Sequence, residues 1–417
     1  MDSVEVLILQ VLVQKFGGTS VQSETNREHV IRHIKDALVQ EYKLVVVVSA
    51  LGRKPDPYAT DSLLSLIDFP ANKNSNRELD LLMSCGEIIS SVVLSNELQK
   101  NHVSATALTG AQAGFVTSED FNRAKIKKVN PVRILHELET HDVVVVAGFQ
   151  GQSESGEITT IGRGGSDTSA AALGVALEAE RIEIFTDVEG IMTADPRVVK
   201  NARPLDVVTY TEICNLAYQG AKVIHPRAVE IAMQGKIPMR IRSTYSERLG
   251  TLVTSSRIEE AGADISERMI TGIAHIANVT QIKVQTKESA YRVQSEVFKA
   301  MAESGISVDF INISPTGVAY TVPAELTTKA IEILEMLGFQ PEITENCAKV
   351  SAVGAGMTGV PGVASKIVQA LTDSGVQILQ SADSHTTIWV LVHDHELVTA
   401  VNALHEVFGL SAEEVPL

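Results

Sequence analysis

The chain has 417 residues, of which 44% are hydrophobic and 21% are charged, and this predicts a globular protein of two or three domains. Its formal net charge of -16 argues against a nucleic acid or an anionic membrane as partner, and aromatic residues, at 4%, are too few for a base-stacking surface. The 3 cysteines, Cys85, Cys214 and Cys347, form no C-x-x-C pattern, which predicts reduced thiols in a cytoplasmic protein.

The N-terminal run "MDSVEVLILQVLVQKF" is predicted to contain a strand. It lacks the basic start of a signal peptide, and it is shorter than the ~20 apolar residues that cross a bilayer. The runs "KLVVVVSALG", "DVVVVAGFQG" and "RIEIFTDVEG" are further strands, and "REHVIRHIKDALVQEY" has helical spacing. Continuous apolar strands between helices predict an α/β domain at 11–254, with a mostly parallel sheet sandwiched by helices. Ligands of such sheets bind beyond the carboxyl ends of the strands.

Two glycine-rich segments follow predicted strands. In "KFGGTS", from Lys15 to Ser20, two glycines allow backbone N–H groups to approach a phosphate, and Lys15 supplies a mobile charge. In "RGGSDTSAA", the glycines precede a helix expected from Ser166 to Glu180, where an anion is favoured at the N-terminus. Arg163 suits bidentate capture of a carboxylate or phosphate, and Asp167 is either a cap or a partner for a lysine.

The segments "FTDVEGIMTADPRV" and "GAKVIHP" contain further polar residues, but taken alone they indicate only structural loops.

The C-terminal part has a different organisation. A polar stretch at 255–267 indicates a linker, and two similar units follow at 268–340 and 341–417, each with the pattern of a small βαββαβ module. The motif "GAGMTG", at 354–359, matches G-x-G-x-x-G, but no acidic residue stands about 20 residues later, and too little chain follows for a two-half Rossmann fold. We therefore interpret it as a loop that leads into a helix.

The motifs "KFGGTS", "LLMSCGE", "RGGSDTSAA", "FTDVEGIMTADPR" and "GAKVIHPRAVE" together resemble those of aspartokinases, members of the amino-acid kinase superfamily. They occur in the family's order, and the C-terminal units resemble the family's two ferredoxin-like ACT domains. Within the family, the pattern is most similar to the diaminopimelate-responsive aspartokinase I type. The resemblance begins near Val11, so "MDSVEVLILQ" looks additional.

The resemblance implies the reaction ATP + L-aspartate → ADP + 4-phospho-L-aspartate, the first step toward lysine, threonine and methionine, with feedback regulation through the ACT domains. The acceptor β-carboxylate has an ordinary pKa of about 3.9 and needs no general base. Catalysis would therefore consist of positioning and charge stabilisation. Mg²⁺ is expected as the companion of ATP, held mainly by phosphates and water, since the sequence names no dedicated metal site.

Residue roles follow from the same resemblance. Arg163 would bind the α-carboxylate of aspartate and Glu87 its α-ammonium, while Asp167 would orient Lys15 on the β- and γ-phosphates. The other substrate contacts would be Ser49, Thr60, Gly164, Gly165 and Ser166. The nucleotide contacts would be Lys15, Phe16, Gly17, Gly18, Thr186, Asp187, Met192, Asp195, Arg197 and Lys222, although relatives often have tyrosine in place of Met192. The effector contacts would be Asn312, Gly362, Val363, Gln377 and Ile378.

Two alternative functions remain from the sequence: a kinase for another amino acid such as glutamate, and an inactive ACT-type amino-acid sensor. The effector is also open among lysine, threonine, the two together and diaminopimelate. The ACT pair implies a homodimer or a larger homo-oligomer.

Overall fold

The computed structural model describes residues 10–221, 223–255, 269–285, 290–355, 357 and 360–411. The chain divides into two compact units. The first consists of the described residues within Met1–Ile191, Pro204–Ala217 and Lys222–Ala263, and the second of those within Met192–Arg203, Tyr218–Ala221 and Asp264–Leu417. Apart from its first residue, the expected linker at 255–267 lies outside the described residues.

An 8-stranded sheet forms the centre of the first unit, with the order β10-β12-β11-β9-β1-β2-β6-β3. All its pairs are parallel except β11 with β12. The expected strands are present, and β6 is buried along its whole length because helices cover both faces. The strands are β1 (Val11–Phe16), β2 (Lys43–Val48), β3 (Ala105–Leu108), β6 (Val143–Ala147), β9 (Arg181–Thr186), β10 (Val207–Thr209), β11 (Met239–Ser243) and β12 (Thr251–Thr254).

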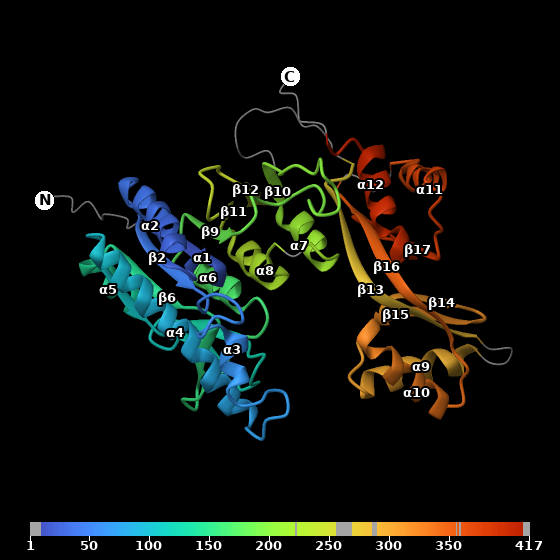
Figure 1. Cartoon of the computed structure of the whole chain (residues 1–417), viewed down its shortest axis with the longest axis horizontal. Helices are drawn as coiled ribbons and strands as arrows, with labels where there is room; N and C mark the ends of the chain where they lie inside the picture. The colour runs from blue at the N-terminus through green and yellow to red at the C-terminus, as the bar shows by residue number, and fades with distance from the viewer. Residues whose placement is uncertain are drawn as a thin grey trace, which may run out of the picture. The chain divides into compact units, whose positions relative to one another are not determined.

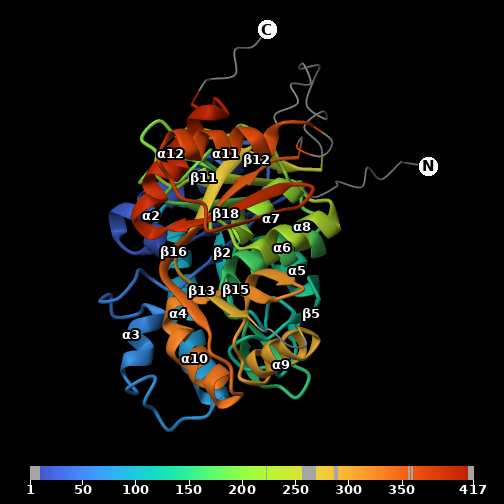
Figure 2. The ribbon, with the colours of Figure 1, turned by 90° about the vertical axis from the view of Figure 1, so that its right-hand side faces the viewer.

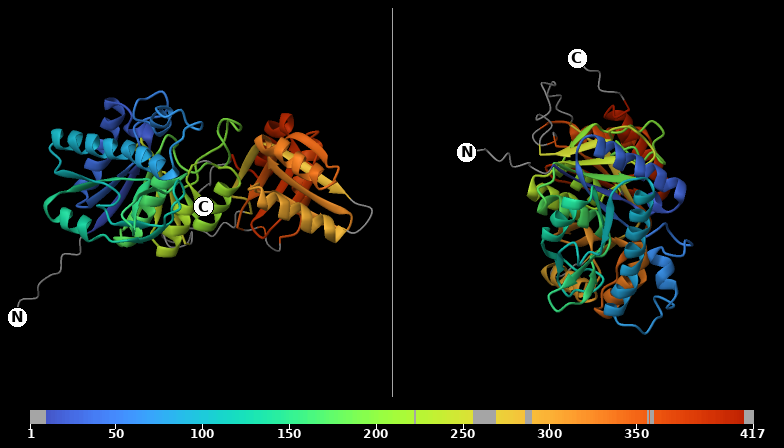
Figure 3. Two further views of the ribbon diagram at one scale, coloured as in Figure 1. Left: turned by 90° about the horizontal axis from the view of Figure 1, so that it is seen from below. Right: turned by 90° about the vertical axis from the view of Figure 1, so that its left-hand side faces the viewer.

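Helices α2 and α4 pack together on one face of this sheet, through a core that includes Ile34, Leu94 and Val46. Helices α5 and α6 lie on the other side of the strands (Figure 3). The helices of the unit are α1 (Gly18–Val21), α2 (Glu24–Val39), α3 (Thr60–Ser65), α4 (Asn76–Lys100), α5 (Val132–Thr140), α6 (Gly165–Ala176), α7 (Tyr210–Tyr218) and α8 (Pro226–Gly235). No helix among the described residues is long and apolar enough to cross a membrane.

Helix α6 is shorter than the helix expected from Ser166 to Glu180. It ends at Ala176, and Glu178 takes a left-handed conformation with φ 48°. The N–H of Glu180 then donates to the carbonyl of Val11 at 2.9 Å. The chain must turn here because β9 runs parallel to β1, so pairing within the sheet ends the helix early.

A second sheet, of 4 strands, was not apparent from the sequence. Its order is β5-β4-β7-β8, formed by β4 (Phe115–Thr117), β5 (Ile126–Val129), β7 (Gln150–Ser153) and β8 (Ile158–Thr160). Strand β8 leads directly into the loop that precedes α6, so this sheet supports the loop that contains Arg163, Gly164 and Gly165.

The second unit has the architecture of two ACT motifs on one 6-stranded sheet, ordered β14-β15-β13-β16-β18-β17 (Figures 1 and 2). Strands β13 (Gly272–Gln285) and β16 (Glu342–Val353) are long and pair antiparallel along both motifs. The start of β13 pairs with the end of β16, and the end of β13 pairs with the start of β16. Each ACT motif therefore contains a strand segment from the other repeat. The other elements are α9 (Ala290–Glu303), β14 (Asp309–Ser314), β15 (Gly317–Pro323), η1 (Ala324–Leu326), α10 (Thr327–Met336), α11 (Val363–Asp373), β17 (Gln380–Asp383), β18 (Thr387–His393), η2 (Asp394–Glu396) and α12 (Leu397–Val407).

Candidate active site

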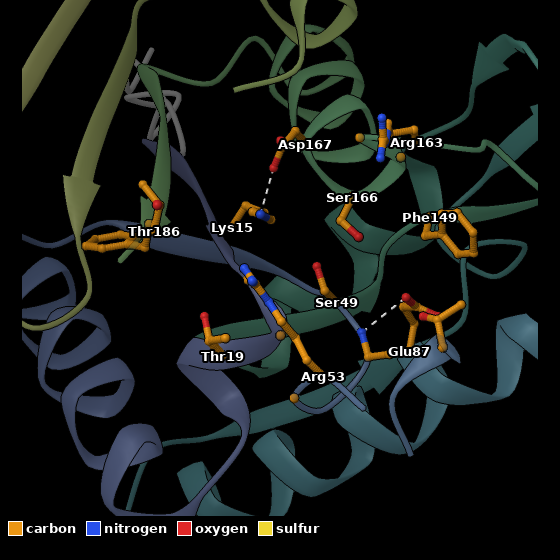
Figure 4. Close-up of a pocket in the computed structure, with 18 of the residues that line it drawn as sticks. Lys15, Thr19, Ser49, Arg53, Glu87, Phe149, Arg163, Ser166, Asp167 and Thr186 are labelled. Carbon is orange, nitrogen blue, oxygen red and sulfur yellow. Dashed lines mark hydrogen bonds and ion pairs between the residues drawn. The ribbon is translucent and has the colours of Figure 1, made fainter. Parts of the chain in front are cut away.

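A pocket of about 410 Å³ opens in the first unit, where the carboxyl ends of β1, β2 and β9 lie side by side with the start of α6 (Figure 4). Thirteen of the sequence-predicted residues line it: Lys15, Gly17, Gly18, Ser49, Thr60, Glu87, Arg163, Gly164, Gly165, Ser166, Asp167, Thr186 and Asp187. Strand order explains this convergence, because β1 lies between β2 and β9 and all three point the same way.

Lys15 and Asp167 form an ion pair inside the pocket. The Nζ atom of Lys15, at the end of β1, lies 2.7 Å from Oδ1 of Asp167 in the first turn of α6. Both side chains are largely buried, with 12% and 14% of their surfaces exposed. The aspartate is therefore a partner of the lysine, and it holds the ammonium group at the mouth of the Gly17–Gly18 turn.

Glu87 is a buried carboxylate with an unfilled hydrogen-bonding position. Its Oε1 accepts from the N–H of Ala50 at 3.1 Å, while its Oε2 is buried with no hydrogen-bond partner among the described residues. Burial raises the pKa of Glu87 from 4.5 to about 8, and the hydrogen bond from Ala50 opposes this shift. A cationic group of a ligand would satisfy both the charge and the free oxygen.

Helix α4 places Glu87 through contacts two turns earlier. Ser75 and Glu78 form a capping box that starts the helix. Asp80 is fully buried and accepts from the N–H of Asn122 and from both the N–H and Oγ1 of Thr160. These bonds fix α4 against the end of β8 and against the loop between β4 and β5, on the helix face where Glu87 also lies.

The loop before α6 depends on Gly164. This residue caps the helix with φ 70°, and a Cβ atom here would lie 2.3 Å from the Cβ and ring of His225. The Nδ1 atom of His225 accepts from the N–H of Arg227 and so caps α8, and burial lowers the pKa of the imidazole. Helix α8 therefore supports the loop through His225, while Arg163 extends from it as an exposed side chain.

Some predicted nucleotide contacts lie elsewhere. Phe16 is fully buried and stacks on Phe185 at 4.5 Å between ring centroids, so only its backbone can reach a ligand. Met192, Asp195 and Arg197 belong to the second unit, where Asp195 accepts an ion-paired hydrogen bond from Arg197 at 2.6 Å. Lys222 lies outside the described residues.

The predicted effector residues all lie in the second unit. Asn312 is exposed on β14, at one end of the strand order. Gly362 and Val363 begin α11, whereas Gln377 and Ile378 follow it, so within one chain about 16 Å of helix separates the two pairs. The N–H of Gln377 donates to Oε1 of Glu396 at 3.1 Å.

The pocket also contains residues to which the sequence analysis assigned no role. Thr19, Arg53 and Phe149 line it (Figure 4). Phe149 has a left-handed backbone, with φ 68°, which is rare for a bulky residue. Its N–H donates to Oγ of Ser169, and its carbonyl accepts from Ile161. Thr19 lies within the KFGGTS motif, and Arg53 and Phe149 follow the ends of β2 and β6, but the sequence analysis gave none of the three a role.

Comparisons with known proteins agree with this geometry. The amino acid kinase family profile matches residues 10–243, and an ACT domain profile matches residues 342–406. Aspartokinase 1 of Bacillus subtilis is 64% identical over 403 residues, which cover 97% of this chain and 100% of the relative. The aspartokinase of Geobacillus stearothermophilus is 39% identical over 409 residues, 97% of this chain and 98% of the relative.

Solved structures give the same result. Aspartokinase III of E. coli in complex with aspartate and ADP has a TM-score of 0.77 at 26% identity, covering 95% of this chain and 99% of that one. The same enzyme with lysine and aspartate, in its T-state, has a TM-score of 0.74 at 27% identity over the same shares. The chain therefore belongs to the aspartokinases, ATP-dependent kinases within the amino acid kinase family.

Proposed function

We propose that this pocket phosphorylates the β-carboxylate of L-aspartate, with Lys15, Asp167, Arg163 and Glu87 as its principal side chains. The observation that carries the proposal is the buried, unfilled Oε2 of Glu87 in the same cavity as the Lys15–Asp167 pair. The carboxylate of Glu87 can bind a cationic group, and Lys15 places a fixed ammonium group beside the glycine turn.

The two ends of the amino acid are recognised by opposite charges. Glu87 receives the α-ammonium, and the guanidinium of Arg163 forms two hydrogen bonds to the α-carboxylate. Ser49, Thr60 and Ser166 contact the rest of the substrate, together with the backbone of Gly164 and Gly165. This arrangement directs the side-chain carboxylate toward the nucleotide. It also disfavours an acylated amino acid, which lacks the ammonium group.

Transfer of the phosphoryl group needs no base, because the acceptor carboxylate is already ionised. A carboxylate oxygen of aspartate forms a bond to the γ-phosphorus while the bond to the β,γ-bridging oxygen breaks, and the electron pair stays on ADP. Lys15, held by Asp167, stabilises the charge that develops on that bridge. Gly17, Gly18, Thr186 and Asp187 border the nucleotide, and the backbone of Phe16 adjoins it. The nucleotide contacts at Met192, Asp195, Arg197 and Lys222 stay predictions from the sequence.

Magnesium enters as part of the MgATP substrate. Among the described residues, no group of three or more histidines, cysteines or carboxylates could hold a metal ion. The phosphates and water would therefore supply most of its ligands, and the ion would neutralise part of the charge on the β- and γ-phosphates.

The ACT unit regulates this reaction by binding an amino-acid effector, for which lysine, threonine and diaminopimelate are the candidates. The E. coli relative with lysine and aspartate is described as the T-state, which supports this role. The two pairs of effector residues at opposite ends of α11 suit a site completed by a second chain, so we propose a homodimer or larger homo-oligomer. The three free cysteines fit a reducing compartment such as the cytoplasm.

The test is a coupled assay of ADP release from MgATP with aspartate, with glutamate and with no amino acid. We expect release that depends on aspartate and a product that reacts as an acyl phosphate. Faster turnover of glutamate would point to another amino-acid kinase. If neither aspartate nor glutamate supported ADP release, the inactive sensor would be the better description.

A further inference from the structure

The pocket contains a basic side chain, that of Arg53, to which the proposed reaction gives no role. Among the residues that the structure describes, three basic side chains line the pocket: Lys15, Arg53 and Arg163. Lys15 is paired with Asp167, and Arg163 is assigned to the substrate's α-carboxylate. Arg53 is exposed, and among the residues that the structure describes no carboxylate or carbonyl pairs with its guanidinium. In Figure 4 its side chain extends toward Lys15, between Thr19 and Ser49.

The turn that carries Arg53 is tied to the glycine loop of β1. The N–H of Gly52 donates to the carbonyl of Gly18 at 2.9 Å. Asp56 accepts from the N–H of Arg53 at 3.0 Å and from Nε2 of Gln22 at 2.8 Å. The carboxylate of Asp56 therefore holds the backbone of the turn and not the guanidinium of Arg53.

Gly52 gives this turn its shape. Its φ is 73°, and a Cβ atom here would lie 2.1 Å from Oδ2 of Asp56. Only glycine allows the left-handed turn and the close approach of Asp56 at once. The base of Arg53 is therefore fixed beside the phosphate loop, while its long side chain can still move.

We propose that Arg53 closes on the γ-phosphoryl group of ATP and stabilises it during transfer, an inference that rests on the proposed function. The transfer brings a carboxylate against an anionic phosphoryl group. The charges of Lys15 and Asp167 largely cancel before substrates bind, and Arg163 and Glu87 are matched to the two ends of aspartate. Among the pocket residues that the structure describes, Arg53 is the remaining cation. Its guanidinium donates hydrogen bonds to the equatorial oxygens without transferring a proton.

The test compares Arg53→Gln and Arg53→Lys with wild type and with Lys54→Gln. Lys54 is exposed in the same turn and does not line the pocket, so its variant removes the same charge one residue away. We expect Arg53→Gln to lower kcat about a hundredfold. KM for aspartate should stay within about twofold, because the substrate's own contacts remain. Arg53→Lys should recover only part of the rate, and Lys54→Gln should match wild type.

Binding measurements with two nucleotides distinguish a contact to the γ-phosphate from contacts to the rest of ATP. Calorimetry with Mg²⁺ should show that Arg53→Gln binds ADP like wild type but binds a β,γ-imido analogue of ATP about tenfold more weakly, a loss of about 1.4 kcal/mol. Equal losses for both nucleotides, a rise in aspartate KM alone, or an unchanged kcat would each overturn the proposal.

Lys15→Ala, measured in the same assay, distinguishes an error in the role of Arg53 from an error in the proposed active site. If Lys15→Ala is inactive while Arg53→Gln is fully active, only the role of Arg53 is wrong. If both retain full activity, the proposed site itself is wrong.

Discussion

The ion pair between Lys15 and Asp167 connects two elements that are distant in sequence, the carboxyl end of β1 and the first turn of α6. The 2.7 Å contact fixes a flexible ammonium group at one position before the nucleotide arrives. A preorganised charge of this kind costs little reorganisation during the reaction, so it contributes more to the transition state than to substrate binding.

Lys15→Ala should therefore lower kcat about a hundredfold, equivalent to roughly 3 kcal/mol, and weaken ATP binding much less. Asp167→Asn keeps the shape of the side chain but loses the ion pair, and we expect a smaller loss of kcat. Steady-state kinetics with both substrates saturating gives the values, and the thermal midpoint checks folding. A near-normal kcat for Lys15→Ala would remove the lysine from the mechanism.

Much of this site could be predicted because parallel strands end at the same edge of a sheet. That rule indicated Lys15, Ser49 and Thr186 without any knowledge of tertiary contacts. Glu87 lies in the middle of a helix with no local signal, so only the resemblance identified it. Its buried position depends on Asp80, which bonds to Asn122 and Thr160 far along the chain.

The second unit shows a different limit of sequence analysis. The repeat of strand and helix patterns predicted two similar small α/β modules, which the resemblance identified as ACT domains, and strands of both repeats lie in the 6-stranded sheet. The exchange of strand segments between β13 and β16 is a long-range pairing, and apolar periodicity within each strand does not reveal its partner. Arg53 was missed for a related reason, because only the fold of the turn between Gly52 and Asp56 places it beside the glycine loop.

The raised pKa of Glu87 predicts how aspartate binding depends on pH. With a pKa of about 8, most of the free enzyme carries the protonated acid at pH 7, whereas the α-ammonium binds the carboxylate. The KM for aspartate should therefore fall about 25-fold between pH 6.5 and pH 8.5. Glu87→Gln should show a high KM for aspartate without this fall, and KM for ATP should change little in either protein. Equal pH profiles for wild type and variant would contradict the role of Glu87.

The same shift affects the stability of the protein without ligands. The folded-state pKa of about 8 lies above the ordinary value of 4.5, so the folded state binds more protons between these limits. The contribution of Glu87 to stability is present below pH 4.5 and is lost as pH rises toward 8, with a ceiling of about 5 kcal/mol. Glu87→Gln should therefore unfold at a higher temperature than wild type at pH 8, with a smaller difference at pH 5. Differential scanning calorimetry at the two pH values measures this, and a difference that is the same at both would contradict it.

Substitution of the exposed Arg163 tests how the α-carboxylate of aspartate is bound. Arg163→Lys keeps the charge but cannot make two parallel hydrogen bonds to a carboxylate. We expect the KM for aspartate to rise at least tenfold, with the KM for ATP within about twofold. Arg123→Lys, which does not line the pocket, serves as the matched control. If the lysine variant lost affinity equally for both substrates, the clamp on the α-carboxylate would be the wrong assignment.

Strand β14 offers the sharpest test of regulation. It stands at one end of the sheet order, and Ile311 and Ile313 beside Asn312 are 47% and 57% exposed. An edge strand with exposed apolar residues is suited to pairing with another chain, and this would bring Asn312 to a seam between subunits.

Asn312→Ala should relieve inhibition and leave the uninhibited reaction intact. An effector changes activity only through its difference in affinity for the active and inactive states, so loss of one contact in the inactive state shifts its titration curve to higher concentration. Uninhibited kcat should stay within about twofold, a change of under ~0.5 kcal/mol. Lysine, threonine and diaminopimelate are titrated against wild type, the variant and Thr316→Ala from the turn of the same hairpin, with dimer content followed by light scattering. An unchanged curve in a dimeric variant would exclude Asn312 from the effector site. Insensitivity of the wild type to all three amino acids, alone and in pairs, would instead refute feedback regulation by these effectors.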